Sequence, residues 1–239
     1  MTASSPAAPA LEIRHVTKSY GGLRPLRIAL LTIAHGERVS IGGLDAGAGE
    51  LLVNLVTGAS LPDAGEIRVF GRRTADIADS EEWLDSLERF GIVSPRSVLL
   101  EGSTLQQNLA MPFTLSIDSV PPAVDEQIHH LAVLCGIDPE RWLRTVAGEL
   151  PADIRVRAHL AKSLALDPAF VIVEHPAADL DPAARLKLAS DLARACSERR
   201  VTTLVLTNDD HFARTVASRN LKLHGATGEL KPIRRGWFS

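Results

Sequence analysis

A glycine-rich stretch stands between two apolar segments near the start of the chain. Residues Glu37–Ile41 have the composition of a short strand, and Glu50–Val56 have that of a short apolar helix ending at Gly58. Gly42 to Gly49 joins the two segments and is rich in glycine and alanine. Because the amino end of a helix exposes N–H groups and a partial positive charge, this order of strand, glycine loop and helix predicts a backbone cradle for an anion.

A second group of polar residues follows a buried strand. Phe170–Val173 is a short apolar run, typical of a parallel strand that is covered on both faces. Glu174 and His175 come directly after it. A carboxylate at this position could hold Mg²⁺ through oxygen, and a histidine could act as a base near neutral pH. The simpler interpretation of His175 is a polar residue at the end of a strand.

Strands and helices alternate along both ends of the chain. Such alternation predicts an α/β core with a parallel sheet, and the mainly helical middle is then an insertion. Strands are expected over residues 11–16, 27–33, 37–41, 66–70, 170–173 and 201–206, and helices over residues 50–56, 81–89, 125–135, 158–166, 182–197 and 211–217.

The composition narrows the classes of protein without identifying the chemistry. The chain has 239 residues, enough for one large domain or two small ones, and a formal charge of −3 with 4% aromatic residues. Neither figure fits a nucleic-acid-binding protein, which would usually be basic and would stack bases on aromatic rings. No apolar run reaches the ~18 residues of a membrane span, and the amino end has no basic segment of a secretory signal. We therefore expect a cytoplasmic protein.

The cysteines and the paired histidines do not suggest a metal site. Cys135 and Cys196 lie far apart in apolar helical segments, so we expect small core residues rather than ligands or a disulfide. His129 and His130 are adjacent on a predicted helix and therefore cannot face one another. We expect no metal bound by these side chains alone.

Five short segments in order resemble the ATP-binding subunit of ABC transporters, over roughly residues 11–230. The segments are Gly36-Glu37-Arg38-Val39, Gly65-Glu66-Ile67, Thr104–Pro112, Leu160–Pro168 and Asp179-Leu180-Asp181-Pro182. The resemblance implies a P-loop NTPase-like (RecA-like) α/β fold, in which a parallel-sheet core carries an N-terminal antiparallel β subdomain and a helical insertion. It also implies a disordered tail over 1–10 and one domain over 11–239, with a core of 11–94 and 167–239 and a helical subdomain of about 95–166.

The phosphate loop of that family reads GxxGxGKST, and this chain departs from it. The aligned stretch runs from Gly43 through Asp45 and Gly47 to Leu51. Gly49 replaces the lysine that reaches the β and γ phosphates, while Glu50 and Leu51 replace the hydroxyl residues, one of which holds Mg²⁺. A carboxylate about 4 Å from a phosphate charge costs about 1 kcal/mol in water and about 4 kcal/mol at an effective dielectric of 20. ATP and Mg²⁺ are therefore ligands by resemblance whose binding we predict to be weak or absent.

The other positions with family roles are mostly replaced too. Glu174 and His175 stand for the Walker B aspartate and the catalytic glutamate, Pro95 for the Q-loop glutamine, and Asn208 for the switch histidine. Asp181 of the D-loop is retained.

The signature and adenine positions complete the comparison with the family. The signature LSGGQ becomes Leu150-Pro151-Ala152-Asp153-Ile154. Asp153 would repel the γ phosphate across a dimer, and we expect it to cap its own helix. Tyr20 stands where the family stacks an aromatic ring on adenine, although a turn residue explains it equally well.

These replacements together predict a pseudo-ATPase that keeps the shape of an ABC subunit. It would dock on an integral-membrane permease through a groove near Pro95 to Phe113, and form a homodimer or a heterodimer with another ABC ATPase subunit, at the cytoplasmic face of the inner membrane. No nucleic acid is implied. The alternatives are an ATP-binding subunit with slow or partner-dependent hydrolysis that uses Glu174 and His175, and a different small ligand in the old cleft.

Two smaller expectations follow. Glu50 is expected to open its helix, and its carboxylate or that of Asp45 is predicted to occupy the emptied phosphate site; the alternative is a solvated glutamate. Lys231 to Arg235, with Trp237 and Phe238 beyond, form a basic and aromatic end. We interpret that end as solvated, with a membrane or permease contact as the alternative.

Overall fold

The computed structural model describes residues 8–233. Most of the expected disordered tail, residues 1–7, and the carboxyl-terminal residues 234–239, including Trp237 and Phe238, lie outside this range. Ala10 belongs to the fold rather than to a tail, because it is fully buried and its carbonyl accepts a hydrogen bond of 2.9 Å from the N–H of Phe70. At the other end, Lys231 lies in a strand and not in a solvated tail.

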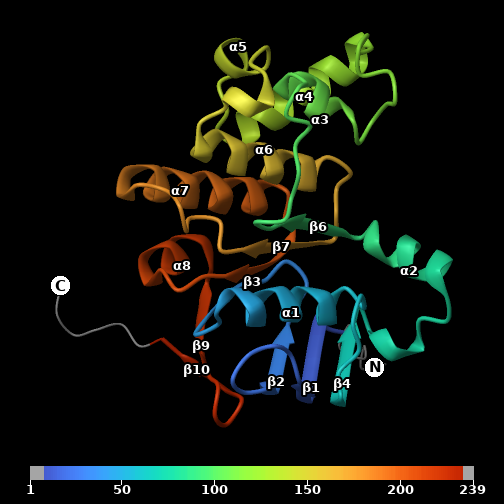
Figure 1. The fold of residues 1–239 in the computed structure, drawn as a ribbon, viewed down its shortest axis with the longest axis vertical. Coiled ribbons are helices and arrows are strands. Elements are labelled where there is room, and N and C mark those ends of the chain that lie inside the picture. The colour runs from blue at the N-terminus through green and yellow to red at the C-terminus, as the bar shows by residue number, and fades with distance from the viewer. Residues whose placement is uncertain (1–7, 234–239) are drawn as a thin grey trace, which may run out of the picture.

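Two sheets form the framework (Figure 1). The smaller, antiparallel sheet has the order β2-β1-β4-β5, with β1 Leu11–Lys18, β2 Leu26–Ile33, β4 Ala64–Val69 and β5 Arg72–Arg73. The larger sheet has the order β10-β9-β3-β8-β7-β6, with β3 Arg38–Gly42, β6 Phe90–Val93, β7 Phe170–Glu174, β8 Thr202–Leu206, β9 Arg219–His224 and β10 Glu229–Pro232. Its strands are parallel from β9 to β6, and β10 runs antiparallel at one edge.

Helices cover both faces of the larger sheet (Figure 1). Helix α1 lies between the two sheets, α7 and α8 lie on the opposite face of the larger sheet, and α3 to α5 form a lobe above it that α6 joins to the sheet. The helices are α1 Ala46–Val56, α2 Ser80–Leu87, α3 Leu105–Ala110, α4 Pro122–Leu134, α5 Pro139–Trp142, α6 Ala152–Leu164, α7 Pro182–Glu198 and α8 Asp210–Val216. The predicted architecture of an α/β core, an antiparallel β part and a helical insertion is confirmed.

The central strand β7 divides the interior into two cores. Phe170 and Ile172 face α1 and the antiparallel sheet, whereas Val171 and Val173 face the helical lobe. All four side chains are almost fully buried. Since side chains of a strand alternate between its faces, this apolar run serves both cores, as expected for a parallel strand covered on each side.

Backbone contact joins α6 to the edge strand β6. A Cβ on Gly91 would overlap the carbonyl oxygen of Ser163, so only glycine fits at this position. The expected strands omitted β5, β6, β9 and β10; β5 has only two residues, β6 only four, and β9 and β10, at one side of the larger sheet, are rich in polar and charged residues rather than apolar runs. Across residues 8–233, every helix is too short or too polar to span a bilayer.

Both cysteines belong to the interior. Cys135 and Cys196 are buried free thiols, and burial is the main cause that raises the pKa of each thiol. The prediction of small core residues without a disulfide is confirmed.

Candidate functional site

Asp45 starts helix α1 at the glycine loop. Its carboxylate accepts a hydrogen bond of 2.8 Å from the N–H of Ala48, the usual geometry of an aspartate N-cap. The helix therefore begins at Ala46, and the prediction that Glu50 opens it is wrong. Asp45 binds one N–H group at the start of α1, and occupation of the emptied phosphate site by a carboxylate stays a prediction.

Asn208 binds the same loop from the end of β8. Its side-chain oxygen accepts a hydrogen bond of 2.7 Å from the N–H of Gly43, and its amide group donates one of 2.9 Å to the carbonyl of Leu44. An amide side chain suits this place because it offers both an acceptor and a donor. Two N–H groups of the predicted anion cradle, those of Gly43 and Ala48, are thus bonded to side chains of this chain.

Arg96 lies between the two carboxylates at this end of the sheet. Its guanidinium nitrogens lie 2.8 and 3.4 Å from the two carboxylate oxygens of Glu174, and one of them lies 3.3 Å from Glu50. The Glu174 side chain is only 1% exposed, whereas those of Arg96 and Glu50 are 42% and 47% exposed. A buried carboxylate is costly without a partner, so Arg96 is what makes an ionised Glu174 tolerable in this interior.

His175 packs against Gly49. A Cβ on Gly49 would lie 3.2 Å from Nε2 of His175 and 3.4 Å from a carboxylate oxygen of Glu174. The His175 backbone has a φ of 45° and its N–H donates to Leu206 at 2.8 Å, while Nε2 is buried with no hydrogen-bond partner among residues 8–233. Gly49 and His175, which stand where the family has a lysine and a glutamate, therefore lie next to each other, and the His175 ring takes up space beside Gly49.

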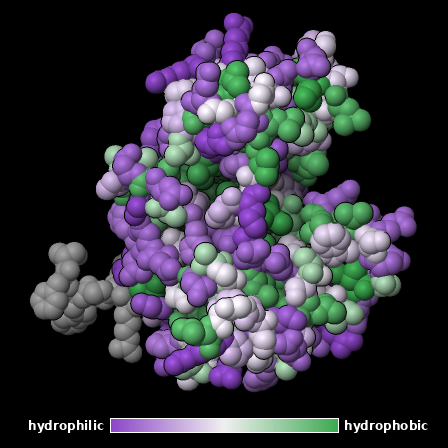
Figure 2. All heavy atoms as spheres, viewed as in Figure 1, coloured by the Kyte–Doolittle hydropathy of each residue, from purple (hydrophilic) through white to green (hydrophobic). Residues whose placement is uncertain are grey.

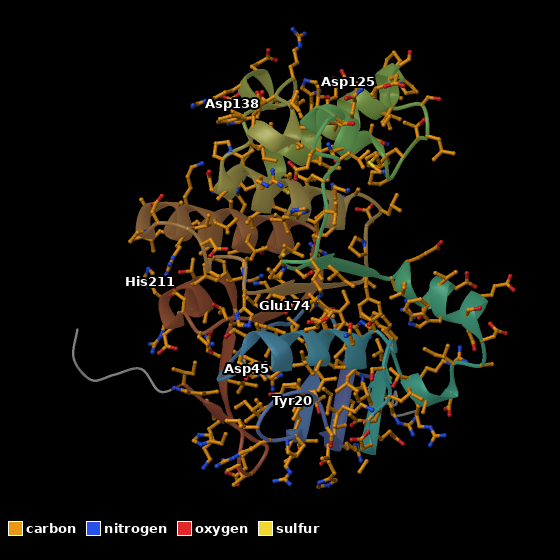
Figure 3. All side chains as sticks on the ribbon, in the orientation of Figure 1. Tyr20, Asp45, Asp125, Asp138, Glu174 and His211 are labelled. Atoms are coloured by element: carbon orange, nitrogen blue, oxygen red, sulfur yellow. The ribbon has the colours of Figure 1, made fainter. Side chains whose placement is uncertain are left out.

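Tyr20 covers the loop from the side of the antiparallel sheet. A Cβ on Gly47 would lie 3.3 Å from its ring, and one on Gly22 would overlap the ring. Burial raises the pKa of Tyr20, and the charge of Asp45 raises it further. An open cavity of about 620 Å³ lies here, lined by Tyr20, Asp45, Gly47, Glu50, Leu51 and Asn54. Tyr20, Asp45 and Glu174 are seen around α1 in Figure 3.

The structure thus brings together most of the predicted site residues of the core. We call this group the loop site: the loop and first turns of α1, with the side chains that bind or pack against them. Its members are Tyr20, Gly43, Asp45, Gly47, Gly49, Glu50, Leu51, Glu174, His175 and Asn208, joined by Arg96.

The remaining predicted residues lie elsewhere. Leu150 and Pro151 precede α6, and Ala152 and Asp153 form its first turn. Pro151 is the N-cap, so the prediction that Asp153 caps this helix is wrong; its carboxylate lies 3.8 Å from the buried Arg157 instead.

Asp181 caps another helix, α7, by accepting a hydrogen bond of 2.9 Å from Ala184. Pro95 lies in the turn after β6, next to Arg96.

A groove separates the edge strand β6 from the helical lobe. It has a volume of about 410 Å³, and its lining includes Phe90, Gly91, Val98, Pro112 and Leu166 with the polar residues Glu88, His159 and Lys162. Val98 is 72% exposed and Leu166 is 61% exposed. Figure 2 shows the outline of the molecule narrowing between the lobe and α2, with hydrophobic atoms along that margin.

A basic group of the groove is held neutral. Burial is the main cause that lowers the pKa of His159 to about 4, and the charges of Lys162 and Arg155 contribute to the same shift. Burial also lowers the pKa of Lys162, whose ammonium donates to the carbonyl of Val98 at 3.3 Å.

Sequence reasoning missed Arg96. One general signal was present: Glu50 adds a carboxylate where the family has a hydroxyl residue, Glu174 keeps the carboxylate of the Walker B position, Gly49 removes the lysine, and a buried carboxylate needs a cation. Arg96 directly follows Pro95, the residue at the Q-loop position.

The curated proteins similar to this chain are transporter ATP-binding subunits. A methionine import ATP-binding protein of Brucella abortus is 28% identical over 232 residues, which cover 95% of this chain and 61% of that protein. A lipoprotein-releasing system ATP-binding protein of Acinetobacter baylyi is 26% identical over 205 residues, covering 86% of this chain and 89% of that protein. The chain thus spans about three fifths of the methionine import proteins, and no family model matches it.

Solved structures give the same fold. The protein cbiO1 of Clostridium perfringens, part of the ABC transporter complex cbiONQ, aligns with a TM-score of 0.77 at 19% identity, covering 94% of this chain and 87% of that one. The ATP-binding cassette MJ0796, a dimer bound to ADP and phosphate, aligns with a TM-score of 0.74 at 22% identity, covering 95% and 100%.

Proposed function

We propose, from the premise that this chain is a homologue of the ATP-binding subunits of ABC transporters, that it is a catalytically impaired member of that group. It acts as a docking subunit: it binds an integral-membrane permease, or a second ATPase subunit, without hydrolysing ATP itself. The fold has the shape of a subunit that makes both contacts, and the polar groups of the loop site bind to other residues of the same chain.

The contact of Arg96 with Glu50 and Glu174 carries this proposal. In a phosphate loop that binds nucleotide, a lysine and Mg²⁺ are the cations, and the phosphates of the nucleotide are the anions. Here the only cation in contact with these two carboxylates, within residues 8–233, is a guanidinium of the same chain. The formal charges of these three side chains sum to −1, so the site already has a cation of its own and keeps a negative charge that disfavours a phosphate.

The residues present do not fit Mg²⁺ and ATP in the family's manner. Gly49 supplies no ammonium group, Leu51 no hydroxyl, and the nearby Glu174 is already bound to Arg96. A phosphate would meet the carboxylate of Glu50 and would have to displace Asn208 from Gly43. Hydrolysis needs metal, lysine and an oriented water together, so these losses act on one unit rather than one by one.

The groove supports the docking part of the proposal. It lies within reach of the predicted stretch from Pro95 to Phe113, since Val98 and Pro112 line it. The exposed apolar side chains of the groove suit the apolar face of an amphipathic segment of a membrane protein. A contact with a second subunit rests on the retained D-loop position Asp181, whose carboxylate caps α7, and on the resemblance to dimeric cassettes. Both partners place the chain at the cytoplasmic face of the membrane.

Calorimetric titration of the purified chain with ATP, with and without Mg²⁺, tests the proposal. We expect no binding at micromolar concentrations in either case. Micromolar affinity for ATP would overturn the pseudo-ATPase assignment. In parallel, the chain is tagged in its own cells, and a permease or a paralogous subunit is expected to co-purify with it.

A second candidate, an ATP-binding subunit with slow hydrolysis, rests on the partial exposure of Arg96. A half-exposed guanidinium beside the start of α1 could turn from Glu50 to a phosphate and so replace the missing lysine. In that case Arg96→Gln would weaken ATP binding at least about tenfold, whereas a pseudo-ATPase shows no binding to weaken.

A further inference from the structure

The turn after β6 has two functional sides. Residues Ser94 to Ser97 form a compact turn: Ser97 N–H donates to the carbonyl of Ser94 at 2.9 Å, and the hydroxyl of Ser97 accepts from Ser94 N–H at 3.1 Å. The hydroxyl of Ser94 accepts in turn from Arg96 N–H at 3.2 Å. These bonds fix the shape of the turn, so its side chains are presented in set directions.

One side of the turn binds the loop site. Arg96 reaches Glu174 at the end of β7 and Glu50 in the second turn of α1. Because Glu174 is buried, breaking its contact with Arg96 would leave an uncompensated carboxylate in the interior. The ion pair of Arg96 with Glu174 therefore connects the turn to the buried core.

The other side of the turn forms a wall of the groove. Val98 follows two residues later, lines the groove, and its carbonyl accepts the hydrogen bond from Lys162 of α6. Beyond it, Leu100 is fastened to α3, since its N–H donates to the buried Asn108 side chain at 2.7 Å and its carbonyl accepts from the same side chain at 3.1 Å.

We infer that Arg96 is a positioning residue that holds this wall of the groove in its docking form without nucleotide. The inference rests on the proposed function, because it describes how the groove of a docking subunit keeps its shape: an ion pair within the chain sets it. The guanidinium occupies the space between the two carboxylates and links the turn to β7 and α1 at once. A docking partner therefore meets the same groove whether or not ATP is present.

Hydrogen–deuterium exchange on the full chain tests this inference. In the Arg96→Gln variant, the amides of residues 97–100 are expected to exchange roughly tenfold faster or more than in the wild type, because one charge-assisted tie to a buried carboxylate is lost. The matched control is Arg14→Gln, which removes an arginine that binds Glu12 on the surface of the antiparallel sheet. We expect it to leave residues 97–100 unchanged.

A conservative variant separates charge from packing. Arg96→Lys keeps a cation and is expected to restore most of the protection of residues 97–100. If Arg96→Gln does not fold, the neutral double variant Arg96→Met, Glu174→Gln is measured instead, and faster exchange of the same amides is again expected. Wild-type exchange at residues 97–100 in a folded variant without the cation would overturn the inference.

Adding Mg²⁺ and ATP distinguishes this inference from the proposed function. Unchanged exchange of residues 97–100 in the wild type supports a groove set without nucleotide. If ATP binds by calorimetry and also changes their exchange, both ideas fail. If ATP binds but the exchange stays the same, only the pseudo-ATPase assignment fails.

Discussion

The loop site and the groove lie on opposite sides of the same turn and differ in how their polar groups are used. In the loop site, Asp45 binds Ala48, Asn208 binds Gly43, and Arg96 binds both neighbouring carboxylates. The groove instead presents exposed apolar side chains such as Val98 and Leu166. Most polar groups of the loop site bind one another, although Nε2 of His175 has no partner among residues 8–233, whereas the groove leaves apolar side chains exposed.

This difference separates two features that the resembled family combines. A site that binds nucleotide must leave N–H groups and cations free until the ligand arrives, and such preorganised polar groups reduce stability. The loop site shows the opposite arrangement, typical of a structural region. Function in this chain is therefore expected at the groove, where apolar area remains exposed.

The largest expected effect comes from removing the cation of the loop site. Arg96→Ala leaves the carboxylate of Glu174 buried and unpaired, so we expect the free energy of unfolding to fall by about 2–3 kcal/mol. Urea denaturation measures this change. The control Arg14→Ala, at an exposed pair, should cost less than about 0.5 kcal/mol. Equal losses for the two variants would mean that the loop site is not closed by its own charges.

Acid should act on the groove through His159. The pKa of this residue is about 4 in the folded chain, below its ordinary value of 6.5, because its ring is buried. The unfolded chain therefore takes up the proton first as pH falls, and stability present above pH 6.5 is lost as pH falls toward 4. We expect a loss of roughly 1–2 kcal/mol, reduced by the partial exposure of the ring.

His159→Gln isolates this contribution. The variant should show a shallower decrease of unfolding free energy over the same pH range than the wild type. Parallel pH curves for the two proteins would show that the His159 ring is well hydrated in the groove.

A smaller effect is expected at the start of α1. Asp45→Ala removes the N-cap and should cost about 1 kcal/mol in thermal or urea unfolding. It also frees the N–H of Ala48, so added sulfate should stabilise the variant more than it stabilises the wild type. Asp79→Ala, at the N-cap of the exposed helix α2, serves as the control. A sulfate response equal in both variants would contradict a self-occupied loop site.

The smallest effect on stability is expected in the groove itself. Val98→Glu together with Leu166→Glu alters two exposed side chains, so the free energy of unfolding should change by less than about 0.5 kcal/mol. Recovery of the chain with the membrane fraction of its cells should nevertheless be lost. Unaltered membrane recovery would move the docking surface away from the groove.

The sequence predicted the fold well because periodic apolar segments determine it. Phe170–Val173 and Val201–Leu206 are short apolar runs, and each became a central strand of the larger sheet. The start of α1 was harder: Gly47 and Gly49 cost about 1 kcal/mol each in a helix, so the stretch looked like a loop. The cap at Asp45 and packing between the sheets outweigh that cost.

The site was predictable in its members and not in its contacts. The motif positions identified Glu50, Glu174 and Asn208, which do lie together. Arg96 was not identified: the two carboxylates indicate that a cation is needed, but its partners lie on two distant segments and no local spacing indicates which cation it is. The roles of these residues in binding or hydrolysis stay predictions.

Gly91 has a consequence for how this protein can diversify. Because α6 touches β6 through backbone atoms at this glycine, the distance between the two walls of the groove is set by the main chain and not by the residues that line it. The lining can therefore change in charge and size while the frame keeps its dimensions. In such an arrangement, substitutions that change the partner need not affect folding. Related chains could therefore exchange partners by substitutions on the surface alone.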